Sequence, residues 1–167
     1  MKLEGGYEIM KLSQNLNDAI NQQIMLELQN QNAYMQIASI FEDMQLKNLA
    51  KFFKEQASDE YDHANLFMDH LNDRNGGKVD IGEVNSPMIT DTDINAIADL
   101  YVWLEQQTTE SIEALYELAL DEKSYIDLPF LLKMLDEQRE EEDTSLRFSV
   151  RIKMVKDLVL FDAEFGD

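Results

Sequence analysis

LKNLAKFFKEQASDEYDHANLFMDHLNDR, residues 46–74, is the stretch that determines the fold. Its apolar residues recur every three or four positions, as on one face of an amphipathic helix; they are Leu46, Leu49, Phe53, Phe67 and Leu71. Polar residues interrupt this face near its middle, where Gln56, Glu60 and His63 stand. The stretch therefore predicts one long helix whose inner face carries groups that can bind a metal.

Three further stretches show the same periodicity. One helix is expected over residues 13–41, and another begins near Thr92, its expected N-cap. The last begins between Ser124 and Leu128, with Pro129 tolerated in its first turn. The three apolar faces are Leu16, Ile20, Ile24, Tyr34, Ala38 and Phe41; Ala98, Tyr101, Ile112, Leu115 and Ala119; and Phe130, Met134, Phe148, Ile152 and Val155. A short apolar tail, residues 158–165, predicts a small fifth helix.

The breaks between these stretches indicate how the helices are connected. A short break at Glu42 and Asp43 joins the first two, with Asp43 as the expected N-cap. Asn75-Gly76-Gly77 stops the second helix, because glycine accepts the left-handed conformation past a helix end. A long crossover, residues 76–91, leads to the third. Two hairpins of long helices joined by one long crossover predict an all-α four-helix bundle.

The composition limits the classes of function. A length of 167 residues indicates one domain, which we place at residues 11–167 behind an extension, residues 1–10, that is given no role. The net charge of −20 argues against binding nucleic acid or an anionic membrane surface, and it favours cations. Since 44% of the residues are apolar, the acidity does not indicate disorder.

Two features that the sequence lacks further limit the possible classes of protein. The chain has no cysteine, which excludes disulfides, thiol catalysis, thiolate zinc sites and cysteine-ligated iron–sulfur clusters. No apolar run reaches the ~18 residues of a membrane helix, and the first ten residues lack the apolar core of a signal peptide. We therefore expect a cytoplasmic protein.

Each of the other three apolar faces is also interrupted near its middle by polar groups. Glu27 interrupts the first helix, Glu105 with Thr108 the third, and Gln138 with Glu141 the fourth. A buried, unpaired carboxylate is costly, and like charges packed together raise that cost. A multivalent cation among them removes the conflict, and oxygen ligands with one imidazole suit iron or manganese.

A motif and an internal repeat support this interpretation. Glu60-x-x-His63 is the motif with which di-metal helical bundles bind their ions, since positions i and i+3 share a helix face. Matching polar residues also recur at an offset of 78 positions in the two hairpins; the pairs are Glu27 and Glu105, Glu60 and Gln138, His63 and Glu141, and Asp59 and Glu137. The hairpins are therefore expected to donate ligands with pseudo-twofold symmetry.

With these residues identified, the chain resembles the non-haem bacterial-type ferritins over residues 12–162. The shared motifs are Leu26-Glu27 with Tyr34, Asp59-Glu60-Tyr61-Asp62-His63, Glu105, and Glu137-Gln138-Arg139-Glu140-Glu141-Glu142. The resemblance implies a ferritin-like bundle with a di-iron ferroxidase centre. By the same resemblance, Glu27, Glu60 and His63 would hold the first iron. Glu60 would bridge to a second iron held by Glu105 and Glu141, with Gln138 beside the pair.

The resemblance also implies a redox-active tyrosine, Tyr34, and a third iron site. The third site would be formed by Asp59, Glu137, Glu140 and the shared Glu141. Two positions depart from the family. Asp59 is one methylene shorter than the usual Glu, and Lys133 stands where some relatives place a tryptophan near the tyrosine.

The function implied by the resemblance is iron storage. Two Fe(II) ions per subunit would be oxidised by dioxygen or peroxide to Fe(III), and the product would pass to a mineral inside a homo-oligomeric 24-mer cage. Leu128 and Leu131 stand where animal ferritins carry the acidic lining of their three-fold channels, so a different pore is expected. A haem at a dimer interface, as in bacterioferritins, is left open by the sequence.

Two other classes of protein share these features. A di-metal carboxylate oxidase or peroxidase would use the same ligands and store nothing. A non-catalytic interaction protein would keep its inner acids hydrated or paired. Taken singly, Tyr34 could be a core residue with its hydroxyl paired, and the run Glu140-Glu141-Glu142 a solvated face. His70 is expected to be solvated or to cap its helix.

Overall fold

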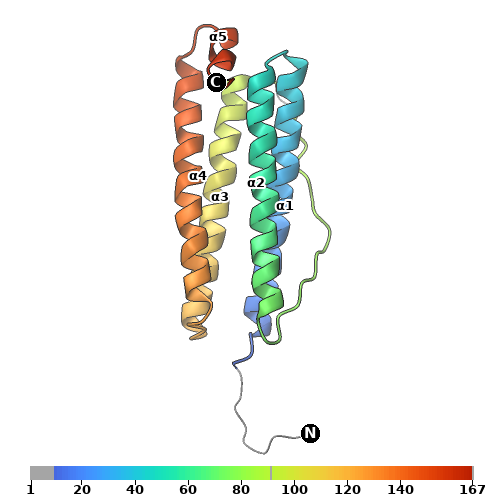
Figure 1. The fold of residues 1–167 in the computed structure, drawn as a ribbon, viewed down its shortest axis with the longest axis vertical. Coiled ribbons are helices and arrows are strands. Elements are labelled where there is room, and N and C mark those ends of the chain that lie inside the picture. The colour runs from blue at the N-terminus through green and yellow to red at the C-terminus, as the bar shows by residue number, and fades with distance from the viewer. Residues whose placement is uncertain (1–9, 91, 167) are drawn as a thin grey trace, which may run out of the picture.

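The computed structural model describes residues 10–90 and 92–166. Its elements are α1 (Gln14–Asp43), α2 (Lys47–Asp73), α3 (Ile94–Asp121), α4 (Leu128–Met154) and the short α5 (Leu158–Ala163). The four long helices run side by side, and α5 lies across one end (Figure 1). Over the described ranges there is no strand. No helix there has the length and apolar character needed to cross a bilayer. The predicted all-α four-helix bundle with a small fifth helix is confirmed.

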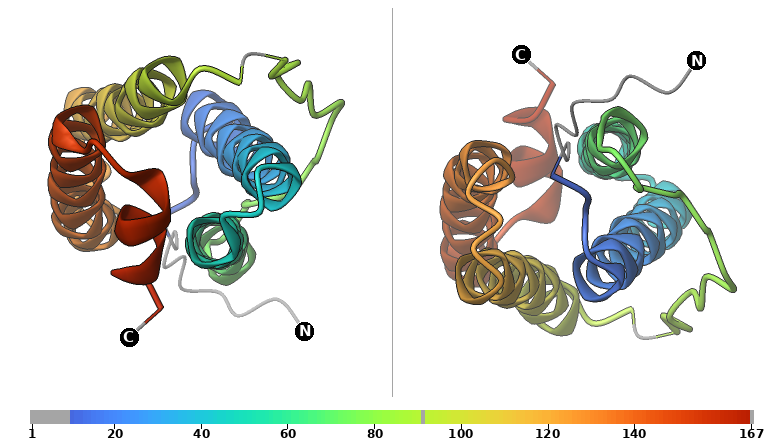
Figure 2. Two further views of the ribbon diagram at one scale, coloured as in Figure 1. Left: turned by 90° about the horizontal axis from the view of Figure 1, so that it is seen from above. Right: turned by 90° about the horizontal axis from the view of Figure 1, so that it is seen from below.

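The two hairpins pack through α1 and α3, as the end-on views show (Figure 2). The crossover between α2 and α3 runs along the outside of α1, over the length of the bundle (Figures 1 and 2). Hydrogen bonds fasten its first part to α1: Asn21 Nδ2 donates to the Lys78 carbonyl at 2.8 Å, and Asn21 Oδ1 accepts from the Asp80 amide at 2.7 Å. The predicted crossover is therefore confirmed.

The core consists of two apolar clusters, one toward each end of the bundle. Phe41, Phe53 and Tyr101 belong to the cluster near α5, and Leu16 and Phe67 belong to the cluster at the other end. The predicted apolar faces supply these clusters, except that Phe130 and Val155 are only partly buried. The polar interruptions fall between the clusters, so the fold places them inside the bundle at mid-length.

The two helix–helix turns share an unusual backbone conformation. Gln45 follows α1 with a φ of 62°, and Lys123 follows α3 with a φ of 57°. Both values are in the left-handed region that favours glycine. The two residues are separated by the same offset of 78 positions that relates the polar groups. The internal repeat therefore extends to the backbone of the turns.

The expectation that Asp43 caps the second helix is wrong. α1 continues through Asp43, and the turn is made by residues 44–46. The N-cap of α2 is Leu46, whose side chain cannot accept a hydrogen bond. Asp162 of α5 takes over this role, because its Oδ1 accepts from the Leu49 amide at 2.8 Å. One helix is thus capped by a residue from another.

Two smaller expectations also need correction. The cap of α3 is Asp93 rather than Thr92, since its Oδ1 accepts from the Ala96 amide at 2.9 Å. His70 is not solvated: its Nε2 lies 2.8 Å from Asp127 Oδ1 in the α3–α4 connection, and its ring stacks on Phe130. The connection between α3 and α4 is thereby tied to α2.

The predicted extension falls mostly outside the described residues, which begin at Met10. The Met10 carbonyl accepts a hydrogen bond from Arg74 Nη1 at 3.3 Å, and the Leu12 amide donates to the Asn75 carbonyl at 2.8 Å. α2 ends at Asp73, and Gly76, with a φ of 82°, lies in the turn that follows, within the predicted stop Asn75-Gly76-Gly77. Met10, which belongs to the range that was given no role, thus contacts the end of α2.

Candidate metal centre

The predicted inner ligands come from all four long helices and lie at mid-length. Glu27 belongs to α1, Glu60 and His63 to α2, and Glu105 to α3. All four side chains are buried, although each is charged or polar. From α4, Gln138 is buried and Glu141 is half-buried. Carboxylates are seldom buried without a partner, so this arrangement calls for a cation.

Glu27, Glu60 and His63 form the tightest group of possible ligands. One oxygen of each carboxylate and one ring nitrogen of the histidine all lie within 4.8 Å of one another. Glu60 and His63 are one turn apart on α2, so their side chains share a face toward α1. The group predicted for the first iron is thus brought together by the fold.

Three buried side-chain oxygens among residues 10–90 and 92–166 have no hydrogen-bond partner: Glu27 Oε2, Asn30 Oδ1 and Glu60 Oε2. A buried polar atom left unpaired costs about 1–3 kcal/mol, and more when it is charged. Two of the three belong to the group with His63, where a bound cation would accept their lone pairs. Two carboxylate oxygens with one imidazole are ligands that suit iron, so this donor set fits the metal implied by the sequence.

Glu105 is bound differently, because both of its oxygens have partners. Tyr34 donates its hydroxyl hydrogen to Oε1. Gln138 Nε2 donates to Oε2 at 2.7 Å and also to the Glu105 carbonyl at 3.1 Å. Burial raises the pKa of Glu105 to about 7, although both hydrogen bonds act to lower it. Glu105 is therefore held in place by donors from α1 and α4.

The acids of the centre raise one another's pKa. Burial raises the pKa of Glu60 well above its usual value, and the charges of Glu27 and Glu105 raise it further. The charge of Glu141 acts in the same direction. Burial, followed by the Glu105 charge, raises the pKa of Glu141 to about 7. The metal-free centre therefore holds protons at pH values where a cation would replace them.

Tyr34 lies beside the centre with its hydroxyl on Glu105 and its ring in the core. Burial and the Glu105 charge raise the pKa of its phenol well above the usual value, so it is a neutral donor. Its ring packs edge-on against Tyr101, with centroids 5.4 Å apart. The Tyr101 hydroxyl in turn donates to Gln56. Two buried phenols thus border the group of acids.

The residues predicted for a third site lie toward the surface. Asp59 is exposed, the side chain of Glu137 is 44% exposed with Lys133 Nζ at 4.0 Å, and that of Glu140 is 76% exposed with Arg139 Nη2 at 3.9 Å. The charges of Asp59, Glu137 and Glu140 all contribute to the raised pKa of Glu141. These acids therefore lie near Glu141 but outside the buried group.

Several polar residues around the centre were not predicted from the sequence. Gln23, Asn30 and Ser111 line the contact between α1 and α3. The sequence contains part of the information needed to find them, because Gln23 stands four positions before Glu27 and Asn30 three positions after it. Residues at that spacing share a helix face. Their partners on α3 could not be predicted from this spacing, since they lie far away in the sequence.

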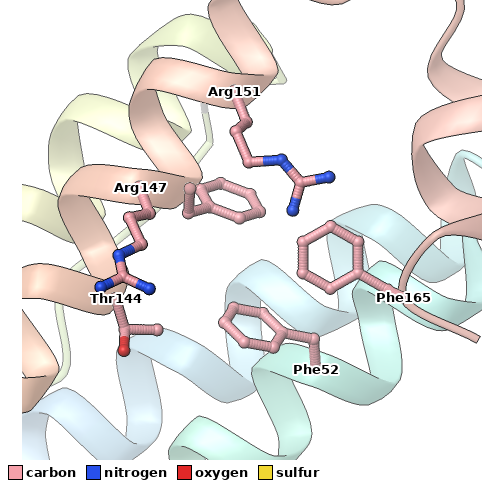
Figure 3. Close-up of a pocket in the computed structure, with 6 residues that line it drawn as sticks. Phe52, Thr144, Arg147, Arg151 and Phe165 are labelled. Atoms are coloured by element: carbon pink, nitrogen blue, oxygen red, sulfur yellow. The ribbon is translucent and has the colours of Figure 1, made fainter. Parts of the chain in front are cut away.

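A pocket of about 210 Å³ lies apart from the acids, between α2, α4 and the C-terminal residues. The rings of Phe52 and Phe165 border it, together with the side chains of Arg147 and Arg151 (Figure 3). Each guanidinium already has a carboxylate partner, Asp143 for Arg147 and Glu164 for Arg151. The pocket therefore belongs to the packing of the bundle end rather than to the metal centre.

Comparison with known proteins supports the resemblance. Residues 17–155 match the family described as "Ferritin-like domain". The bacterial non-heme ferritin of Staphylococcus aureus (strain USA300) is 32% identical over 162 residues, covering 93% of this chain and 95% of that protein. The corresponding protein of Staphylococcus haemolyticus is 32% identical over 136 residues, covering 80% of each chain.

Solved structures agree with the sequence relatives. An open pore ferritin from the archaeon Archaeoglobus fulgidus superposes with a TM-score of 0.88 at 27% identity, covering 92% of this chain and 96% of that one. A form of the same ferritin engineered to be closed also gives 0.88, at 28% identity, covering 93% of this chain and 96% of that one. The family match spans most of the chain and includes every helix that carries the centre, and the chain therefore belongs to the ferritin family.

Proposed function

We propose that the protein is a cytoplasmic iron-storage ferritin with ferroxidase activity. Each subunit binds two Fe(II) ions, oxidises them and passes Fe(III) to a mineral core. The observation that carries this proposal is the buried group of Glu27, Glu60 and His63, in which two carboxylate oxygens lack any partner. Such a group is unfavourable without a cation and well suited to iron with one.

The four helices divide the ligands between two ions. Glu27, Glu60 and His63 hold the first Fe(II). Glu60 also bridges to the second, which Glu105 and Glu141 complete. Gln138 keeps Glu105 in place through its hydrogen bonds. This arrangement follows the di-iron carboxylate bundles, with Gln138 and Glu141 standing where the second Glu-x-x-His would be.

The reaction requires two electrons for each dioxygen reduced to peroxide. Two Fe(II) ions supply one electron each, two protons are taken up, and two Fe(III) ions and hydrogen peroxide result. Carboxylates suit this change because they bind both oxidation states and can alter how many oxygens they use. Binding of Fe(II) releases the protons that the acids hold in the metal-free state, and the adjoining acids raise the local concentration of cations.

Two further features extend the proposal. A third iron site lies next to the buried centre and is formed by Asp59, Glu137 and Glu140, with Glu141 shared. The charges of the first three all raise the pKa of Glu141, which supports their closeness to it. Tyr34 serves as an additional electron donor when dioxygen is reduced beyond peroxide. Its hydrogen bond to Glu105 supports this role, because loss of an electron from the phenol would pass its proton to that carboxylate.

We further propose that the chain assembles into a homo-oligomeric 24-mer cage. Leu146, Val150 and Met154 recur every four residues on α4 and are exposed, as are Val159 and Leu160 on α5. We call these five residues the α4–α5 apolar face. An exposed apolar surface of this kind is typical of a contact with another protein, and a second copy of the chain is the partner that a cage requires. Leu131 is fully buried in the apolar core of the bundle, so this position supplies no acidic lining of the kind found in the channels of animal ferritins.

An aerobic Fe(II) titration of the metal-free protein tests the function. Ferric absorbance should rise in a fast phase that saturates near two irons per subunit, and this phase should vanish in Glu60→Ala. Continued uptake of many more irons in soluble form would support storage. Repeated turnover without build-up of mineral would instead indicate the non-storing oxidase or peroxidase. Oxidation at the protein-free rate in both proteins would contradict the metal centre.

A further inference from the structure

One hydrogen bond determines which oxygen of Glu27 is left for a metal. Gln23, one turn earlier on α1, donates from Nε2 to Glu27 Oε1 at 2.7 Å. Both side chains are fully buried, so water does not compete for this bond. Glu27 Oε2 has no partner. The carboxylate is thus divided into one engaged oxygen and one available oxygen.

The Gln23 amide also has a hydrogen bond from the neighbouring hairpin. Ser111 of α3 donates its hydroxyl hydrogen to Gln23 Oε1. The amide oxygen thus lies on Ser111, and the amide nitrogen faces Glu27. Rotation of the amide by half a turn would place its oxygen against the carboxylate, where two acceptors would repel each other. Since a serine hydroxyl can donate or accept, the Glu27 carboxylate sets the direction of the amide, and Ser111 anchors the oxygen end of the amide.

Contacts on the other side of Glu27 keep α1 in register with α3. Asn30 Nδ2 donates to Thr108 Oγ1 at 2.8 Å. The Thr108 hydroxyl donates its own hydrogen to the Leu104 carbonyl at 3.1 Å. The lone pairs of its oxygen are therefore free to accept from Asn30. Hydrogen bonds between α1 and α3 thus lie before and after Glu27, and they fix the position of its backbone.

The internal repeat does not provide Glu105 with an equivalent pair of hydrogen-bonding residues. The residue 78 positions after Gln23 is Tyr101, and its hydroxyl bonds to Gln56 instead. The residue 78 positions before Ser111 is Ala33, which has no polar side chain. The arrangement therefore acts on Glu27 alone and distinguishes the two halves of the centre.

We propose that Gln23, anchored by Ser111, is a positioning residue that makes Glu27 bind its metal through Oε2 only. The inference rests on the proposed function, in which Glu27 is a ligand of the first ion. One-oxygen binding keeps the coordination number low and leaves a position for dioxygen or water. Hydrogen-bond partners of metal ligands typically change metal affinity 10–100-fold when removed.

Calorimetric titration with Zn(II) tests the proposal without redox chemistry. Gln23→Leu removes the donor at similar volume, and Ser111→Ala removes the anchor of the amide oxygen. Gln22→Leu removes an exposed amide next to Gln23 and serves as the matched control. We expect Gln23→Leu to weaken the first Zn(II) by about tenfold or more, Ser111→Ala to weaken it less, and Gln22→Leu to match wild type.

The visible absorption of bound Co(II) reports how the ion is coordinated, and a mere loss of protein stability would not change it. Without its bond to Gln23, Glu27 can use both oxygens, so the coordination number rises and the Co(II) bands of Gln23→Leu should weaken and shift. The inference would be overturned if wild type, Gln23→Leu and Ser111→Ala bound Zn(II) equally well, or if the Co(II) spectrum of Gln23→Leu were unchanged. Either result would leave the proposed function intact. A wild-type protein that binds neither ion would instead contradict the proposed function.

Discussion

Glu27 and Glu105 occupy equivalent positions in the two hairpins, yet their carboxylates are held differently. Glu27 has one oxygen on Gln23 and one without a partner. Glu105 has one oxygen on Tyr34 and the other on Gln138. A metal at Glu27 therefore meets an oxygen that accepts no hydrogen bond, whereas a metal at Glu105 must share its oxygen with a hydrogen-bond donor. The first ion should bind more tightly than the second.

The metal-free protein should lose stability as the pH rises. The folded-state pKa of Glu105 is raised to about 7 and that of Glu60 is raised well above its usual value. Raised values mean that the folded state binds more protons, so the contribution is favourable below the unfolded pKa and is lost as pH rises through the folded pKa. Glu60→Gln, whose amide can donate to Glu27, should flatten this dependence and be more stable by about 1–3 kcal/mol at about pH 8.

Thermal unfolding of both metal-free proteins at about pH 5 and about pH 8 measures this effect. Zn(II) should then raise the melting temperature of wild type and leave Glu60→Gln nearly unchanged, because a ligand stabilises only the form that binds it. Parallel pH curves for the two proteins, or equal stabilisation by Zn(II), would contradict the assignment of Glu60.

The contribution of Asp127 to the stability of the fold should depend on pH in the opposite direction. The residue is fully buried, and hydrogen bonds from His70, Arg74 and Ser124 lower its pKa to about 2 against the effect of burial. Its contribution is present above the unfolded pKa and is lost as pH falls toward 2. Asp127→Asn should destabilise the protein by about 2–4 kcal/mol near neutral pH, since it leaves Arg74 without its charged partner.

Chemical denaturation of wild type and Asp127→Asn at several pH values tests this prediction. The difference in unfolding free energy between the two proteins should shrink as the pH falls below about 4, where the wild-type carboxyl begins to lose its advantage. A difference that stays constant down to low pH would show that the charge of Asp127 does not stabilise the fold.

Sequence reasoning selected the acids that the fold brings together because each interrupts a regular apolar face. Glu27, Glu60 and Glu105 all fall in phase with core residues, and the family resemblance assigned their roles. Gln23 and Asn30 were missed, although they share the face of Glu27. Their meaning depends on partners from α3, and periodicity within one helix cannot show which helix lies opposite.

At the scale of helices, the start of α2 is held by a residue from another element. α2 has no side-chain cap of its own, and Asp162 of α5 accepts from the Leu49 amide and from Asn48 Nδ2. The helix spans were predictable because they follow from a 3.6-residue period. The cap was not, because Asp162 is separated from Leu49 by 113 positions, and the nearby Asp43 offered a plausible local alternative.

Asp162→Ala should therefore destabilise the protein by about 1 kcal/mol, the usual effect of losing an N-cap. It should also release α5, because the same carboxylate fastens α5 to the start of α2. Amide hydrogen exchange should become faster in both α5 and the first turn of α2. Faster exchange in α5 alone, with α2 unchanged, would show that the cap contributes nothing to α2.

At the scale of the whole molecule, the two hairpins are joined at three levels. Asp127 connects the α3–α4 turn to His70 and Arg74 at one end, and Asp162 connects α5 to α2 at the other. Between them, the hydrogen bonds of α1 with α3 flank the acids. Acids that repel one another can be kept at the centre of the bundle because both ends are tied.

The α4–α5 apolar face predicts how the molecule assembles. Val150 is 57% exposed in the single chain. Val150→Asp should disrupt the oligomer, because a charge at the middle of an apolar contact would be buried without a partner. Val150→Thr keeps the shape and should still assemble. Analytical ultracentrifugation of wild type and both variants gives the result, and a full-size assembly of Val150→Asp would place the contact elsewhere.

The most direct test of the central claim is anomalous diffraction from crystals of the protein loaded with iron. Two strong peaks are expected inside each bundle, one among Glu27, Glu60 and His63 and the other among Glu60, Glu105 and Glu141. Iron found only beside exposed acids such as Glu140, with the buried acids still paired through shared protons, would contradict the account.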